Sequence, residues 1–134
     1  VPIVHMIRQT ARALAQLGRR RVGVLATDGT IQTGLYQSEC AAQGIEAVAP
    51  APDIQALVMS IIYDEIKRGE PGSREKFSAI DRHLRQQGCD GGILACTELS
   101  VYRAWHSLPG YYVDAMEVLA EQSILACGYP LRTL

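Results

Sequence analysis

The sequence predicts an α/β fold in which a parallel β-sheet carries helices on both of its faces. Short apolar runs with the character of buried strands alternate with longer segments of helical periodicity. The strand-like runs are apolar throughout rather than alternating, which is typical of strands covered on both sides. With 134 residues and 48% hydrophobic residues, the chain is long enough to form a domain with its own core.

The predicted elements are separated by clear turn and helix-end signals. They are, in order, an extended stretch at 2–5, a helix at 6–17, a strand at 21–26, a helix from about 30 to 43, a strand at 45–49, a helix at 54–66, a helix from about 73 to 88, a strand at 93–95, a helix from about 97 to 105, a strand at 111–113 and a closing helix at 115–127. Gly18, Gly44 and Gly69 mark helix ends, because glycine readily adopts the left-handed conformation found there.

Polar residues stand directly after three of these strands. Thr27-Asp28-Gly29-Thr30 follows the first, Cys96-Thr97-Glu98 the third, and Asp114 the last. Right-handed crossovers place the carboxyl ends of parallel strands at one edge of the sheet, where ligands bind in folds of this class. We therefore expect the three groups to converge although they are far apart in the sequence.

Cys96 is the first candidate for chemistry. It follows the apolar run 93–95 and precedes a helix, whose free N–H groups and partial positive charge favour thiolate over thiol. We therefore expect its pKa to lie below the free value, although a buried structural cysteine is an alternative interpretation. A cysteine–histidine hydrolase would need His5, His83 or His106 beside it, and of these only His5 is expected at a strand end.

Two further segments offer groups that bind anions. Thr27, Gly29 and Thr30 combine hydroxyls, a small residue and a helix N-terminus, which suits a carboxylate or phosphate. A simple capped turn explains the same residues. Lys67 brings a cation to the end of the helix at 54–66, where it could bind a carboxylate or only complement the helix dipole.

Several classes of function lack support in the sequence. Neither the phosphate-binding loop spacing nor G-x-G-x-x-G occurs, so we expect no nucleotide cofactor. The four cysteines, Cys40, Cys89, Cys96 and Cys127, lack the C-x-x-C spacing of a zinc site, so we expect reduced thiols and no metal. The net charge of −1 gives no case for binding nucleic acid. No apolar run reaches the roughly 20 residues that cross a bilayer, and no secretory signal is evident, so we expect a cytoplasmic protein.

Five segments along the chain form an ordered series of motifs. They are Val22-Gly23-Val24-Leu25-Ala26-Thr27-Asp28-Gly29-Thr30, Thr33-Gly34-Leu35-Tyr36-Gln37, Ile62-Tyr63 to Lys67 with Gly69, Ala95-Cys96-Thr97-Glu98-Leu99, and Val113-Asp114. In order and spacing this series resembles the C-terminal part of the aspartate/glutamate racemases. The resemblance covers nearly the whole chain, and the Ala-Thr-x-Gly-Thr and Cys-Thr-Glu-Leu motifs are together its most specific part.

The resemblance implies a cofactor-independent amino-acid racemase, an isomerase that needs no PLP. Its two similar α/β domains, each a flavodoxin-like three-layer sandwich, would contribute one cysteine each to the cleft between them, and Cys96 matches one of the two. Thr97, Glu98 and the segment 27–30 would then lie beside the substrate, and Lys67 would bind a substrate carboxylate. Two thiols suit this reaction, because inversion removes a proton from one face of a planar carbanion and returns one to the other.

The resemblance also implies that part of the machinery lies outside this sequence. The family's first cysteine, in a Cys-Asn-Thr motif, would precede Val1, and the stretch 2–6 resembles the last strand of an N-terminal domain. We therefore expect 1–20 to be the end of that domain with a connecting helix, and 21–134 to be the C-terminal domain with its closing helix. The expected partners are a small dicarboxylate amino acid, the missing N-terminal domain and a second copy in a homodimer.

Two alternatives remain open. A one-cysteine relative of the same fold, such as an arylmalonate decarboxylase-like or maleate isomerase-like enzyme, would need only Cys96. The charge of Lys67 favours a dicarboxylate over an aryl acid. A dicarboxylate-binding module without turnover would also fit, since the fragment alone is expected to be inactive.

Overall fold

Four parallel strands form the sheet at the centre of the molecule. A computed structural model describes residues 3–118 and 120. The strands are Arg21–Leu25 (β1), Glu46–Val48 (β2), Gly91–Leu94 (β3) and Tyr112–Asp114 (β4), and they lie in the order β2-β1-β3-β4. All three strand pairs are parallel, which confirms the predicted fold class.

Helices connect the strands and end close to the predicted glycines. They are α1 (Ile3–Gln16), α2 (Asp28–Thr33), α3 (Leu35–Ala42), α4 (Pro52–Ser60), the π-helical turn η1 (Ile61–Glu65), the 3₁₀ turn η2 (Ile66–Arg68), α5 (Arg74–Gln86) and α6 (Thr97–His106). Residues 115–118 and 120 are also helical, and the rest of the predicted closing helix lies outside the described residues. Within the described part of the chain, no helix is both long and apolar enough to cross a membrane.

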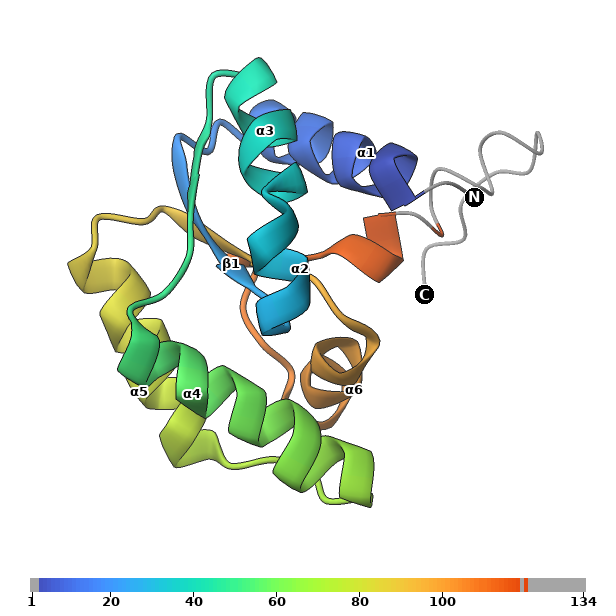
Figure 1. The fold of residues 1–134 in the computed structure, drawn as a ribbon, viewed down its shortest axis with the longest axis vertical. Coiled ribbons are helices and arrows are strands. Elements are labelled where there is room, and N and C mark those ends of the chain that lie inside the picture. Colours follow the sequence, from blue (N-terminus) through green and yellow to red (C-terminus); the bar gives the residue numbers. More distant parts are fainter. Residues whose placement is uncertain (1–2, 119, 121–134) are drawn as a thin grey trace.

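The sheet separates two hydrophobic clusters, one on each face. Val24 and Ile93 face the cluster built with α1 and α3, whereas Leu25 and Leu94 face the cluster built with α4, η1, η2, α5 and α6. This alternation follows from the two-residue period of a strand. Figure 1 shows the consequence: α1 and α3 lie together on one side of β1, and α4 and α5 lie together on the other.

The N-terminal stretch differs from its prediction. Residues 3–5 belong to α1 instead of an extended segment, and His5 is an exposed helical residue rather than one at a strand end. The sequence spacing agrees with this earlier start, because apolar residues recur every four positions at 3, 7 and 11. Through Ile7, Ala11 and its neighbours, α1 packs into the same core cluster as the sheet.

Two predicted helices are interrupted. The segment from about 30 to 43 divides at Gly34, which adopts the left-handed conformation (φ 69°), so that α2 ends and α3 begins there. The helix at 54–66 passes through the π-helical turn η1, where the amide of Ile66 donates to the carbonyls of Ile61 and Ile62. Apolar periodicity does not reveal either break, because the apolar residues on both sides still face the core.

The register of the strands brings the predicted polar groups to one edge. Leu25 of β1 is paired with Leu94 of β3, and Leu94 with Asp114 of β4. Thr27 and Cys96 each stand two residues beyond one of these paired leucines, on neighbouring strands whose typical separation is about 4.8 Å. The predicted convergence at the carboxyl edge is therefore confirmed for β1, β3 and β4.

Candidate active site

Cys96 stands where β3 gives way to α6. It is the N-cap residue of α6, with an extended backbone (φ −147°, ψ 157°), and its carbonyl accepts hydrogen bonds from the amides of Leu99 and Ser100. Its side chain is partly exposed, whereas Cys40 and Cys89 are buried. The predicted arrangement of strand, cysteine and helix is confirmed.

The protonation state of Cys96 differs from the prediction. The pKa of the Cys96 thiol is raised to about 11, mainly by burial. The carboxylate of Glu98 also acts to raise this pKa, whereas the backbone amides of Leu99 and Glu98 act to lower it. The expectation of a pKa below the free value is therefore wrong for this structure. Loss of hydration of the thiolate outweighs the positive end of the helix dipole, so Cys96 is a thiol at neutral pH.

Glu98 joins two of the predicted site residues. Its Oε2 accepts a hydrogen bond from Thr97 Oγ1 at 3.0 Å, and its Oε1 pairs with Lys67 Nζ at 3.0 Å. Burial pushes the pKa of Glu98 upward, but the hydrogen bonds from Lys67 and Thr97 outweigh it and leave the pKa lowered. The hydrogen bond to Glu98 raises the pKa of Lys67. Both groups are therefore charged at neutral pH.

Lys67 reaches this position from the other side of the site. It lies in η2, which packs against α6, and its ammonium also lies 5.0 Å from the centre of the Tyr63 ring. Its side chain remains 47% exposed, so the ammonium is open to a ligand. Lys67 also occupies the last turn before Gly69, where a cation complements the helix dipole, and both predicted roles fit this geometry.

The segment after β1 forms a second group, in which two hydroxyls contact each other. Thr27 is the N-cap of α2, its Oγ1 accepts from the Thr30 amide at 3.4 Å, and the two hydroxyls are 3.1 Å apart. A Cβ placed on Gly29 would meet no atom within 4 Å, so this residue leaves open space beside the hydroxyls. The capped turn is present, and it exposes the groups that a carboxylate would bind.

Gln55 holds this segment in place and was not predicted. Its side-chain amide donates to the carbonyl of Ala26 at 2.8 Å and to Oδ1 of Asp28 at 3.0 Å. These bonds fix the chain on both sides of Thr27. The sequence offers no signal for this role, because Gln55 is one polar residue of an amphipathic helix.

Asp114 and Tyr36 complete the buried side of the edge. Asp114 accepts from Ser100 Oγ at 2.8 Å and from the amide of Met116 at 2.9 Å, which ties β4 to α6. The hydroxyl of Tyr36 is buried without a hydrogen-bond partner in the described residues. Burial raises the pKa of Tyr36, and the nearby groups of Cys40, Cys96 and Asp114 raise it further. Tyr36 was not predicted as a site residue, although it lies in one of the segments that carry the family resemblance.

The three histidines have contacts away from Cys96. His106 lies at the opposite end of α6 and contacts Arg74 Nε at 3.1 Å, His83 Nε2 accepts the amide of Ala51 at 3.2 Å, and His5 is exposed on α1. The structure therefore gives no support to a cysteine–histidine hydrolase. Within the described residues, no group of three or more His, Cys, Asp or Glu side chains is placed to hold a metal ion.

The other cysteines stand at positions that differ from that of Cys96. Cys40 lies inside α3, and Cys89 precedes β3 at the opposite end of the sheet. Cys127 lies outside the described residues. Neither Cys40 nor Cys89 occupies the carboxyl end of a strand.

Comparison with known proteins agrees with this geometry. The family model of the Asp/Glu/Hydantoin racemases matches residues 1–123. The chain is 27% identical over 142 residues to the glutamate racemase of Corynebacterium glutamicum, covering 94% of this chain and 50% of that protein. The aspartate racemase of Picrophilus torridus has a TM-score of 0.72 and 27% identity, over 95% of this chain and 53% of that one.

A further structure shows the same fold. An aspartate racemase homologue from Pyrococcus horikoshii has a TM-score of 0.78 and 25% identity, over 92% of this chain and 55% of that one. The chain thus spans about half the length of each of these three proteins. Because the family model matches most of the sequence and the fold agrees, the chain belongs to the Asp/Glu/Hydantoin racemase family.

Proposed function

We propose that this chain is the C-terminal half of a PLP-independent aspartate or glutamate racemase, in which Cys96 is one of two cysteines that transfer protons. The observation that carries the proposal is the position of Cys96 at the end of β3, next to the Lys67–Glu98 ion pair. The relatives named as aspartate and glutamate racemases support the same reaction. The second cysteine would come from the other half of the protein.

The raised pKa of Cys96 supports a specific part for this residue in the proposed reaction. Because its pKa is raised to about 11, Cys96 rests as a thiol and acts first as an acid. A thiolate on the opposite wall removes the α-proton, so that the C–H bond breaks and its electron pair remains on the α-carbon. The S–H bond of Cys96 then breaks, and its proton joins the α-carbon from the other face. In the reverse direction the two thiols exchange roles.

The charges around Cys96 favour a substrate with two carboxylates. A carbanion beside a carboxylate is stabilised where fixed hydrogen-bond donors and cations face the developing charge. Lys67, Thr27, Thr30 and Thr97 provide such groups, and the space above Gly29 leaves room for the substrate. We propose that a substrate carboxylate binds Lys67, either in place of Glu98 or together with it.

The rest of the protein belongs to the same proposal. We propose that residues 21–134 form the C-terminal domain, that 1–20 lead from an N-terminal domain with its own catalytic cysteine, and that the enzyme is a cytoplasmic homodimer. These points follow from the resemblance and from the match to about half of each relative. In this arrangement the 134-residue chain holds one wall of the cleft and should bind a dicarboxylate only weakly.

Exchange of the α-hydrogen tests the proposed reaction. The full-length protein is incubated with L-aspartate or L-glutamate in deuterated water, and deuterium incorporation is followed by NMR while circular dichroism follows racemisation. We expect both signals to develop together and to disappear in Cys96→Ala. Consumption of a diacid by decarboxylation or by cis–trans isomerisation instead would favour the one-cysteine alternative, and D-aspartate formation by the 134-residue chain alone would contradict the two-thiol mechanism.

A further inference from the structure

The chain uses lysine at only two positions, and both lie around the same turn. It contains two lysines, Lys67 and Lys76, among its 13 basic residues, and all of the others are arginines. Each lysine pairs with a glutamate: Lys67 with Glu98 and Lys76 with Glu65. The Lys67–Glu98 pair belongs to the candidate active site. The Lys76–Glu65 pair lies outside that site and joins α5 to η1.

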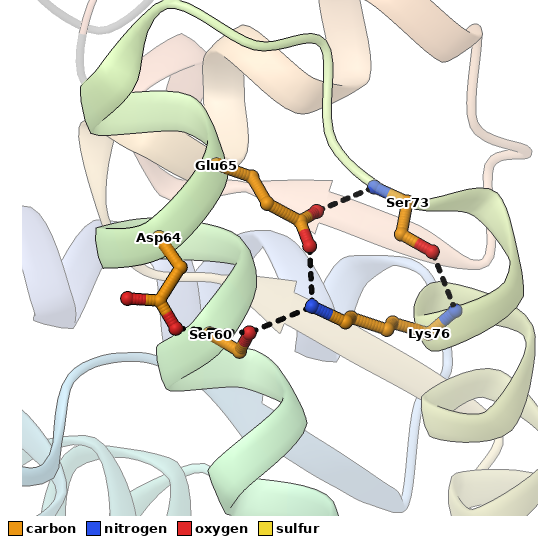
Figure 2. A network of polar contacts seen from close by, with 5 residues as sticks. All are labelled: Ser60, Asp64, Glu65, Ser73 and Lys76. Atoms are coloured by element: carbon orange, nitrogen blue, oxygen red, sulfur yellow. Dashed lines mark hydrogen bonds and ion pairs between the residues drawn. The ribbon is translucent and has the colours of Figure 1, made fainter.

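Glu65 is a charged residue in a mostly buried position. It stands four residues after Ile61 and three after Ile62 on the apolar side of the helix, and its side chain is only 12% exposed. Figure 2 shows its carboxylate between the helix and α5, where Oε2 pairs with Lys76 Nζ and Oε1 accepts the Ser73 amide at 2.6 Å. The carboxylate of Glu65 therefore has two partners, the ammonium of Lys76 in α5 and the amide of Ser73, the N-cap residue of α5.

The same contacts reach back to α4. Lys76 Nζ donates to Ser60 Oγ at 2.7 Å, and Ser60 Oγ donates to Oδ2 of Asp64 at 3.2 Å (Figure 2). The network thus links α4, the π-helical turn and the start of α5. Single π-helical turns inside helices often occur at functional sites, because they change the direction of the residues that follow.

Glu65 also contacts the backbone of the loop beyond Lys67. It is the last residue of η1, and its φ of −120° departs from helical values. Its carbonyl accepts the amide of Glu70 at 2.9 Å, while its carboxylate accepts the amide of Ser73. Both groups of Glu65 therefore hold the loop that follows Lys67.

The far side of this loop is seated on α6. Gly72 has a φ of +89°, and a Cβ placed there would lie 2.7 Å from the ring of Tyr102. The short turn η2 is consequently held between Glu65 on one side and α6, whose N-cap residue is Cys96, on the other. The position of η2 fixes where the Lys67 side chain leaves the backbone.

The partial burial of this ion pair argues for a role besides stability, because the Glu65 side chain is only 12% exposed while that of Lys76 is 33% exposed. Replacing a buried ion pair by apolar residues of similar size is often neutral or stabilising, because both charges lose hydration. A leucine at position 65 would continue the apolar stripe formed by Ile61 and Ile62. A pair whose carboxylate is mostly buried is better suited to selecting one arrangement of the chain, since that carboxylate needs a partner in the right place.

We propose that the Glu65–Lys76 ion pair is a positioning device for Lys67, which holds η2 so that the Lys67 ammonium faces Glu98 and the Cys96 end of β3. The role of Lys67 toward a substrate carboxylate rests on the proposed function, but its position does not. Glu65 and Lys76 act through Lys67 and do not touch the substrate. Their loss should raise KM for the dicarboxylate more than it lowers kcat.

The test uses the reactivity of the Lys67 amine in the full-length protein without substrate. Lys76→Arg keeps the ion pair and Lys76→Met removes it, and in both variants Lys67 is the only lysine of this chain. Limited acetylation followed by peptide mapping then gives the rate at Lys67. We expect Lys67 to react about two- to fivefold faster in Lys76→Met than in Lys76→Arg, the range expected for release of an exposed ion pair. Glu98→Gln removes the charge that pairs with Lys67, and it therefore gives the acetylation rate of Lys67 without the ion pair.

Two controls separate positioning from general loss of structure. Glu39→Gln breaks the Arg8–Glu39 pair between α1 and α3 and should leave the Lys67 rate unchanged. If Lys76→Met does not fold, Glu65→Gln/Lys76→Met removes both charges, keeps an acceptor for the Ser73 amide and should show the same acceleration. Thermal unfolding of each variant confirms that folded protein is compared.

The outcomes are decisive because the assay needs no turnover. Equal Lys67 rates in Lys76→Met and Lys76→Arg, beside a faster rate in Glu98→Gln, would overturn the positioning role. Equal rates in Glu98→Gln and the unchanged protein would remove the Lys67–Glu98 contact and the inference with it. Unchanged aspartate binding in Lys67→Met would instead overturn the proposed role of Lys67 in substrate binding and leave the positioning result standing.

Discussion

The two halves of the candidate active site are assembled in different ways. At the end of β1, Thr27 and Thr30 bond to each other across three residues, so the group is formed by its own short segment. At the end of β3, Glu98 meets Lys67 from a separate turn. The contact between the two hydroxyls of the first half is local, although Gln55 of α4 also holds the chain on both sides of Thr27. The second half exists only when η2 is packed against α6.

This difference predicts unequal sensitivity to mutation. Short-range hydrogen bonds tolerate changes elsewhere in the fold, because their geometry is set by the local backbone. A contact between distant segments depends on every interaction that sets their distance, including the Glu65–Lys76 pair. Mutations should therefore disturb the Lys67–Glu98 half more readily than the 27–30 half.

Removal of the Cys96 thiol should have the largest effect. In the full-length protein, Cys96→Ala should lower kcat for racemisation of aspartate or glutamate by about 10²- to 10⁴-fold, the usual contribution of a general acid or base. Circular dichroism of the amino acid measures the rate. Cys89→Ala, at the other end of β3, is the matched control and should retain activity; a Cys96→Ala enzyme of normal kcat would remove Cys96 from the mechanism.

Removal of the charge at position 67 should come next. Lys67→Met keeps the apolar stem and should weaken binding of aspartate or succinate about tenfold or more, as expected for loss of a hydrogen bond to a charged group. Isothermal titration with the full-length protein gives the affinity, and Thr30→Ala should have a smaller effect. Unchanged affinity in Lys67→Met would leave Lys67 as a helix-end cation.

Alkylation rates sharpen the comparison among the cysteines. Cys40 is fully buried and Cys89 is 7% exposed, whereas Cys96 is partly exposed. Cys96 should therefore react fastest of the three with iodoacetamide, because its thiol is the most accessible and not because its pKa is low. Its rate should keep rising as the pH approaches about 11, which peptide mapping across a pH series would show. A rate that levels off near neutral pH would mean that the helix N-terminus does lower the pKa.

The two helix caps should differ modestly in their contribution to stability. Ser73 Oγ accepts the Lys76 amide at 3.2 Å, whereas Thr27 Oγ1 accepts the Thr30 amide at 3.4 Å and caps a much shorter helix. Ser73→Ala should lower the free energy of unfolding by about 1 kcal/mol and Thr27→Ala by about 0.5 kcal/mol. Urea unfolding measures both. A larger loss in Thr27→Ala would show that the β1 half depends on more than its local bonds.

A last prediction concerns stability at alkaline pH. The pKa of Cys96 and that of Cys40 are each raised from 9.0 to about 11 in the folded chain, mainly by burial. The unfolded chain therefore releases these protons first, so the stabilising contribution is complete below pH 9 and is lost as the pH rises toward about 11. Urea midpoints across this range should fall less steeply in Cys40→Ala and Cys96→Ala. Parallel curves for all three proteins would contradict the raised values.

Local patterns in the sequence were sufficient for the sheet and its edge. Apolar strands, helix periodicity and the glycines at helix ends depend on neighbouring residues, so they predicted the parallel sheet and the place of Cys96 after β3. The breaks at Gly34 and in η1 were missed, because the apolar stripe continues through them. The same continuity hid the role of Glu65, which looks like one more charge in a polar helix segment.

Tertiary structure alone decided the electrostatics of the site. The sequence supplied Lys67, Glu98 and Cys96, and the resemblance supplied their expected roles, but neither contained the Lys67–Glu98 contact or the direction of the Cys96 pKa. The helix that should have lowered this pKa is present at the expected position. Burial around the thiol outweighs it, and burial depends on how the helices pack over the sheet, since the free energy of a charge is set by all the groups and water around it.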